Sequence, residues 1–178
     1  VHVPSVRNEC KELLFVVERE ADGREPSVRC INFGLDGMQS FSFTLEEERS
    51  AVLVPAGQVG TYLYEPNASV LKAGAFKQIA VRTGVKKLQV NSHLYTADHL
   101  VSDFPGRRFR VDEVLSFTGK LCKGLSKTIP QANITVRNFP LSVEELRKRT
   151  KITDGGHVYL FATTLVDGEK VLVKCSKA

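Results

Sequence analysis

The sequence predicts a mixed fold of class α+β / α/β, because short strands and short helices alternate along its 178 residues. Three observations carry this prediction. Runs of β-branched and aromatic residues with a period of two recur between glycine, proline and asparagine. Capping residues precede runs whose apolar residues recur every three to four positions. An Asp-Gly pair at 167–168, flanked by strand-forming residues, predicts a hairpin.

The first 56 residues are expected to form a strand, a helix and a hairpin. The run VHVPSV predicts the strand, and Ser5 is placed to cap the helix. The helix is predicted from apolar residues at helical spacing: Cys10, Leu13, Leu14 and Val17. After a turn at 21–26, VRCINF and QSFSFT flank two glycines and predict a hairpin. This order is typical of the end of a parallel α/β sheet, so we expect the chain to be a piece of a longer protein.

Residues 57–103 are expected to form a β-α-β unit. The run TYLYEP predicts its first strand, and Asn67 is placed as the N-cap of one helix from about residue 68 to 82. Gly84 can end that helix in the left-handed conformation. The second strand, KKLQV, is expected to point two side chains inward, Leu88 and Val90.

Residues 104–178 predict the order β-α-β-α-β-β. A strand in which Phe109 alternates with arginines is followed by Thr118, which can cap a short helix through residue 125. After a strand at 134–137, Ser142 and Glu145 have the spacing of a capping box, which predicts a helix over 143–149. The Asp-Gly hairpin closes the unit.

The charge is divided unevenly along the chain, although the net charge is only +5. Residues 1–65 carry 6 Lys and Arg against 11 Asp and Glu, a net charge of −5, and residues 66–178 carry 19 against 9, a net charge of +10. A basic module of this kind predicts a polyanionic partner. The alternative is a solvated basic surface that binds nothing.

The residues predict no catalytic, metal or cofactor-binding group in this chain. The four cysteines have neither CxxC nor zinc spacing, so we interpret them as reduced, packed thiols. For Cys122 the alternative is a thiol whose pKa is lowered by neighbouring Lys120 and Lys123. The histidines are not spaced as ligands, and neither a GxSxG elbow nor a glycine-rich cofactor loop occurs. The segment Pro66-Asn67 shares only part of the Asn-Pro-Pro-aromatic motif of amino-methylating enzymes, and we assign it to helix capping.

No long apolar segment or signal peptide is evident, so a cytoplasmic protein without a membrane partner is expected. The best candidates for binding RNA are basic residues of the last unit, because guanidinium and ammonium groups bind phosphate oxygens. They are Arg107, Arg108, Arg110, Lys120, Lys123, Arg147, Lys148 and Lys151. Arg137 ranks lower because its strand is expected to be central. The interleaved Phe104, Phe109 and Phe139 are assigned to the core.

Two long strings, YLYEPNASVLKAGAFKQIA and IPQANITVRNFPLSVEELRKRTKITDGGHVYLFATTL, resemble the C-terminal region of a bacterial family of class I SAM-dependent methyltransferases. The resemblance implies three parts. Residues 1–56 would be the C-terminal remnant of a Rossmann-like methyltransferase core, residues 57–103 a ferredoxin-like segment and residues 104–178 a THUMP-like domain.

The resemblance also implies a function. THUMP domains present structured RNA to a catalytic domain, so this chain would bind RNA for a methyltransferase core that it largely lacks. S-adenosyl-L-methionine would be the cofactor of the full-length parent, and this chain alone would be inactive. Its uncovered sheet remnant is expected to pack on the remaining chain, on the missing core or on a second copy, as a homo-oligomer. Two alternatives are a structural or protein-interaction module, and a methyltransferase with a substrate other than RNA.

Overall fold

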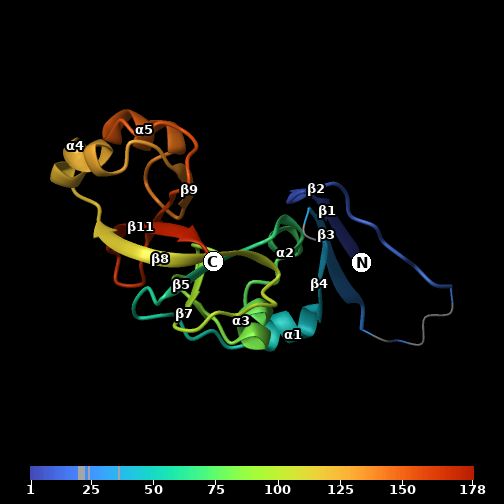
Figure 1. The fold of residues 1–178 in the computed structure, drawn as a ribbon. Helices are drawn as coiled ribbons and strands as arrows, with labels where there is room; N and C mark the ends of the chain where they lie inside the picture. Colours follow the sequence, from blue (N-terminus) through green and yellow to red (C-terminus); the bar gives the residue numbers. More distant parts are fainter. Residues whose placement is uncertain (20–22, 24, 36) are drawn as a thin grey trace. The chain divides into compact units, whose positions relative to one another are not determined.

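The computed structural model describes residues 1–19, 23, 25–35 and 37–178 (Figure 1). The chain forms two compact units. Unit 1 comprises residues 1–53, 65–85 and 101–107, and unit 2 comprises residues 54–64, 86–100 and 108–178. Both combine strands with short helices, so the predicted mixed class is confirmed. Residues 21, 22 and 24 of the turn predicted at 21–26 lie outside the described residues. None of the helices described is long and apolar enough to cross a membrane.

Unit 1 is built on a four-stranded sheet in the order β2-β1-β3-β4. These strands span Glu9–Cys10, His2–Val6, Ser27–Gly34 and Gly37–Thr44. β1 lies parallel to β3, with Val3 opposite Cys30, and β3 pairs antiparallel with β4 up to Gly34 opposite Gly37. The predicted first strand and hairpin are therefore confirmed. Alternating side chains of β3 and β4 are buried because one face of the sheet forms the core of the unit.

The helix predicted after Ser5 is wrong. The Ser5 hydroxyl is buried and donates to Asn32 Oδ1 at 2.6 Å, so it caps nothing. Arg7 and Asn8 take positive φ values of 50° and 63° and turn the chain into β2. No helix occurs among residues 11–19, which are all described. The physical reason is the unbroken apolar run LLFVV, which has no polar face and therefore matches a helical spacing only by accident.

Three short helices belong to unit 1: α1 (Leu45–Ser50), α2 (Ala68–Ala73) and α3 (Gln78–Thr83). The single helix predicted over 68–82 is wrong, because Gly74 is left-handed and ends α2. The Glu48 carboxylate, on α1, then accepts hydrogen bonds from the amides of Phe76, Lys77 and Gln78 at 2.8–3.1 Å. It therefore supplies a start for α3 from a distant part of the sequence. The N-cap at Asn67 and the left-handed Gly84 are confirmed.

The larger sheet has the strand order β6-β7-β5-β8-β11-β10-β9. In that order the strands span Lys86–Lys87, Tyr95–Ala97, Tyr62–Pro66, Gly106–Ser116, Lys170–Lys177, Tyr159–Thr164 and Asn133–Arg137. Two helices, α4 (Gly119–Thr128) and α5 (Val143–Thr150), complete the predicted β-α-β-α-β-β order. The hairpin at Asp167-Gly168 is confirmed, with Gly168 at φ 88°.

The pairing fixes the directions of α4 and α5. β11 runs antiparallel to both β8 and β10, and β9 runs parallel to β10, so β8, β9 and β10 all start at one end of the sheet. α4 leads from the end of β8 to the start of β9, and α5 leads from the end of β9 to the start of β10. Both helices therefore run back toward the end where these strands start, which we call the strand-start end.

Two apolar clusters lie on opposite sides of β10 and β11, because neighbouring residues of a strand point to opposite faces. On one side Leu160, Ala162 and Leu172 pack with Leu125 and Leu146 of the helices. Phe161, Val171 and Val173 belong to the other cluster, which also contains Phe109, Leu63 and Leu88.

Two details of unit 2 correct the sequence interpretation. Val90 is 64% exposed, because the strand predicted around it ends after Lys87. Arg137 lies in β9, which is an edge strand and not a central one. An edge position was hard to foresee, since the apolar alternation of β9 is the same as that of a strand with two neighbours.

The capping box of α5 allows a test of the fold. The Ser142 hydroxyl accepts from the Glu145 amide at 3.2 Å, and the Glu145 carboxylate accepts from the Ser142 amide at 2.8 Å. We expect Ser142→Ala to lower the free energy of unfolding by about 0.5–2 kcal/mol, because the first turn loses its acceptor. Urea melts measure the effect. Ser126→Ala, inside α4, is the control and should change stability by no more than about 0.5 kcal/mol. Equal midpoints for both variants would contradict the cap.

The environment of His93 predicts that the stability of unit 2 depends on pH. Burial, together with nearby Lys87 and Arg137, lowers the pKa of His93 from 6.5 to about 4. Between about pH 6.5 and pH 4, His93 therefore binds a proton in the unfolded chain but not in the folded chain. The free energy of unfolding should thus fall as the pH is lowered through this window. We expect His93→Asn to flatten this fall in urea melts, and Asn tolerates the φ of 50° at this position. A slope in His93→Asn identical to that of the parent would refute the assignment.

Candidate functional site: a polar pocket and a basic sheet end

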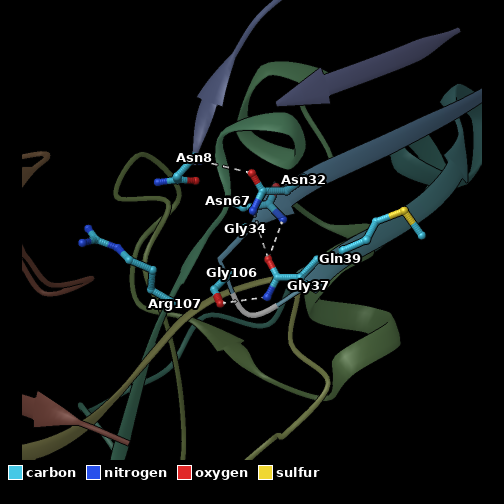
Figure 2. Close-up of a pocket in the computed structure, with 9 residues that line it drawn as sticks. Asn8, Asn32, Gly34, Gly37, Gln39, Asn67, Gly106 and Arg107 are labelled. Carbon is cyan, nitrogen blue, oxygen red and sulfur yellow. Dashed lines mark hydrogen bonds between the residues drawn. The ribbon is translucent and has the colours of Figure 1, made fainter. Parts of the chain in front are cut away.

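Unit 1 contains a polar pocket of about 210 Å³ (Figure 2). Its polar lining consists mainly of the carboxamide side chains of Asn8, Asn32, Gln39 and Asn67. Asn8 follows the end of β1 and Asn32 lies near the end of β3, so the pocket lies at the carboxyl ends of two parallel strands. Ligands of α/β sheets bind outside the carboxyl ends of parallel strands. This position makes the pocket the candidate site of unit 1.

Hydrogen bonds fix the orientation of these carboxamides. Asn32 Oδ1 accepts from the Ser5 hydroxyl at 2.6 Å and from the backbone N–H of Asn8 at 3.2 Å. Gln39 Oε1 accepts from Asn67 Nδ2 at 3.1 Å, and Gln39 Nε2 donates to the Gly106 carbonyl at 3.4 Å. The dashed lines in Figure 2 follow this network across four segments of unit 1. The lining is therefore ordered before any ligand enters.

One wall of the pocket depends on a close backbone contact and an ion pair. A Cβ atom at Gly106 would lie 2.2 Å from the Glu65 carbonyl oxygen, so this position accepts only glycine without a shift of the backbone. The next residue, Arg107, donates from Nε to the Glu65 carboxylate at 2.8 Å and also pairs with it through Nη2. The Glu65 side chain is 3% exposed. Arg107, a predicted RNA contact, therefore holds a buried carboxylate beside the pocket.

In unit 2, four of the predicted basic residues lie at the strand-start end. Arg108 and Arg110 are at the start of β8, and Lys148 and Lys151 are at the C-terminal end of α5. Arg110, Lys148 and Lys151 are exposed, and Arg108 is partly buried. They are separated in sequence by about forty residues, and the return direction of α5 brings them to the same end. We call these four residues the basic end.

The other predicted residues of unit 2 either lie nearer the opposite end of the sheet or stabilise the fold. Lys120 and Lys123 are exposed in the first half of α4, nearer the opposite end of the sheet. Arg147 donates to the carbonyls of Ile152 and Ala132 at 3.2–3.3 Å and pairs with Asp154, so it holds the end of α5 in place. Phe109 is buried and Phe139 is packed against Phe117, as predicted.

A second cavity, which the sequence did not reveal, lies between α4 and α5. Lys123 and Arg149 line it together with Cys122, in a volume of about 240 Å³. Arg149 was omitted from the sequence candidates because nothing local shows which face of α5 approaches α4. Burial raises the pKa of Cys122, and the nearby Arg149 charge offsets only part of this effect. The surroundings of Cys122 therefore argue against an activated thiol.

The remaining cysteines are also free, and burial raises the pKa values of Cys30 and Cys175 to about 12. In the part of the chain that the structure describes, no three His, Cys, Asp or Glu side chains are grouped so as to hold a metal ion. The chemistry available at the two sites is thus neutral hydrogen bonding in unit 1 and cation–anion pairing in unit 2.

Comparison with known proteins agrees with this architecture. Residues 62–105 match the model of a ferredoxin-like domain, and residues 106–177 match that of a THUMP domain-like family. Among solved structures, the crystal structure of a putative methyltransferase from Porphyromonas gingivalis W83 is similar, with 44% sequence identity and a TM-score of 0.91. The match covers 99% of this chain and 45% of that one. The chain thus spans less than half the length of this relative. A search of curated proteins gives no match.

The ion pair beside the pocket generates a stability prediction. We expect Arg107→Met to lower the free energy of unfolding by about 1–3 kcal/mol, because the buried Glu65 carboxylate loses this cation. Adding Glu65→Gln should recover part of the loss, since the neutral amide costs less to bury. Urea melts of the single and double variants measure this. Arg110→Met is the exposed control, and an effect on stability equal to that of Arg107→Met would argue against a structural ion pair.

Proposed function

We propose that this chain is the RNA-binding region of a SAM-dependent methyltransferase, and that it presents structured RNA to a catalytic core outside the chain. The observation that carries the proposal is the match of residues 106–177 to a THUMP domain-like model, in a unit whose topology gathers cations at one end. THUMP domains typically bind RNA. The methyltransferase assignment draws on the similar structure, of which the chain covers 45%.

Within this proposal the three predicted parts keep their roles. Residues 1–56 complete the sheet of the methyltransferase core, residues 57–103 form the ferredoxin-like segment and residues 104–178 the THUMP-like domain. S-adenosyl-L-methionine binds to the core of the parent protein, which acts in the cytoplasm. The basic end binds and positions the RNA, and it takes no part in the transfer of the methyl group.

The basic end acts through the phosphate backbone. Arg110 offers an exposed guanidinium group at the start of β8, close in sequence to the partly buried Arg108, and Lys148 and Lys151 offer ammonium groups at the end of α5. Arginine pairs with phosphate oxygens through two parallel hydrogen bonds, whereas lysine acts as a mobile point charge. Contacts of this kind carry affinity and register without reading sequence, so many structured RNAs should bind.

A docking surface for acidic protein is the competing function, because residues 1–65 carry a net charge of −5. The two functions differ in their response to salt. Phosphate contacts release condensed counterions, so the logarithm of the RNA affinity falls linearly and steeply with the logarithm of the salt concentration. Exposed protein ion pairs are screened much more gently.

The test compares two triple variants that remove the same charge. Arg110→Gln, Lys148→Gln and Lys151→Gln neutralise the basic end, while Lys120→Gln, Lys123→Gln and Lys170→Gln neutralise exposed lysines nearer the opposite end of the sheet. We expect the first triple to weaken binding to structured RNA and to flatten the salt slope by up to about three units, since each lost phosphate contact removes roughly 0.9 unit. The second triple should change the slope by less than one unit.

Filter binding across a salt series gives the slopes, and melting curves show whether each variant is folded. Arg107 and Arg147 are excluded from both variants because each holds an ion pair within the fold. A larger effect of the second triple would move the RNA surface to α4 and the start of β11. Equal, shallow slopes for all three proteins would contradict RNA binding and favour protein docking.

A further inference from the structure

We infer that the polar pocket of unit 1 binds a single nucleobase. The inference is independent of the basic end, since the pocket is formed within unit 1 and contains none of the four basic-end residues. It rests on three properties of the pocket: the neutral lining, which offers both hydrogen-bond donors and acceptors, a side-chain donor of the lining residue Asn8 that has no partner among the described residues, and a volume suited to one ring system.

The lining favours a neutral, planar and polar ligand. A carboxamide carries an acceptor and two donors in one plane, so it can pair with the edge of a base, as Asn and Gln do with adenine in DNA recognition. Arg107 is the charged residue of the lining, and its guanidinium is paired with Glu65. A phosphate or carboxylate would find no uncommitted cation among the described lining residues. The pocket therefore differs in chemistry from the basic end.

Asn8 offers a hydrogen-bond donor to an incoming ligand. Its Oδ1 accepts from the Ala68 amide at 2.7 Å, which fixes the side chain and leaves Nδ2 with no partner among the described residues. Asn8 is exposed and sits at the turn after β1, at the rim of the pocket (Figure 2). The orientation that Ala68 imposes makes Nδ2 a donor held in place before binding, which reduces the entropy lost on binding.

The size and the remaining lining fit one ring system. A pocket of about 210 Å³ is smaller than the roughly 300–1,000 Å³ that drug-sized ligands occupy. Gly34 and Gly37 place bare backbone beside the pocket, where no side chain of theirs competes with a ligand. One base, with its sugar left outside, meets these limits.

A nucleobase could come from two sources, an unpaired base of RNA or the adenine of S-adenosyl-L-methionine. Both present the same edge chemistry. The probes that separate them are the four ribonucleosides and S-adenosylhomocysteine, which carry no phosphate. The four nucleosides are uncharged, so the basic end contributes nothing to their binding. S-adenosylhomocysteine carries one carboxylate, and shifts at the pocket amides distinguish binding there from a contact at the basic end. Failure of this test would therefore leave the proposed function intact, and failure of the salt titration would leave the pocket intact.

The experiment is a titration of the isotope-labelled chain followed by amide chemical shifts. We expect at least one of the five probes to shift the backbone and side-chain amides of Asn8, Asn32, Gln39 and Asn67 in a saturable way. Tighter binding of S-adenosylhomocysteine than of adenosine would identify the cofactor as the source, and a preference for another nucleoside would identify RNA. The variant Asn8→Asp keeps the acceptor for Ala68 and replaces the open donor with an acceptor, so it should weaken binding at least tenfold.

The matched control is Asn138→Asp, an exposed asparagine of unit 2 with a similar φ of 51°. It adds the same negative charge at a residue that does not line the pocket and should leave the affinity within twofold of the parent. Absence of saturable shifts at these amides with all five probes would overturn the inference. So would equal affinities of the parent and Asn8→Asp, or shifts produced only by a peptide that carries Asn and Gln side chains.

Discussion

The burial of β10 and β11 on both faces is the constraint on which the arrangement of unit 2 depends. Leu160 and Leu172 point to one side, while Phe161 and Val173 point to the other, and all four are almost fully buried. A strand that is apolar on both faces needs cover on both. The crossover helices α4 and α5 supply one cover, and they can do so only by running back over the sheet. The cation-rich end of α5 and the start of β8 therefore share one end.

This constraint explains why residues distant in sequence form one candidate surface. The last turn of α5 is basic for a local reason as well, because cations stabilise the C-terminal end of a helix dipole. Arg147 shows the difference between the two uses of charge, since its guanidinium is bound to carbonyls and to Asp154. Lys148 and Lys151 face solvent at the same helix end. Of the basic residues at this helix end, Arg147 therefore stabilises the fold, whereas Lys148 and Lys151 are the candidates for ligand binding.

Much of the fold followed from local sequence signals, and the errors have a common physical origin. The Asp-Gly hairpin, the Ser142 capping box and the Asn67 N-cap were predicted, because each depends on a few adjacent residues. The start of α3 could not be predicted, because the Glu48 carboxylate that caps it lies about thirty residues away in the sequence. A distant residue also intervenes at Ser5, because Asn32 on β3 accepts from the hydroxyl that was expected to cap a helix. Likewise the pocket gathers carboxamides from four segments, and its separate asparagines gave no signal in sequence.

The central claim, that the basic end contacts RNA, is tested most directly by ultraviolet crosslinking of the intact chain to bulk transfer RNA, with the crosslinked peptides mapped by mass spectrometry. The account predicts crosslinks on the peptides that contain residues 108–110 and 148–151, and their loss as salt is raised. Crosslinks confined to the first half of α4 would contradict it, and so would RNA that binds the chain without any crosslink at the basic end.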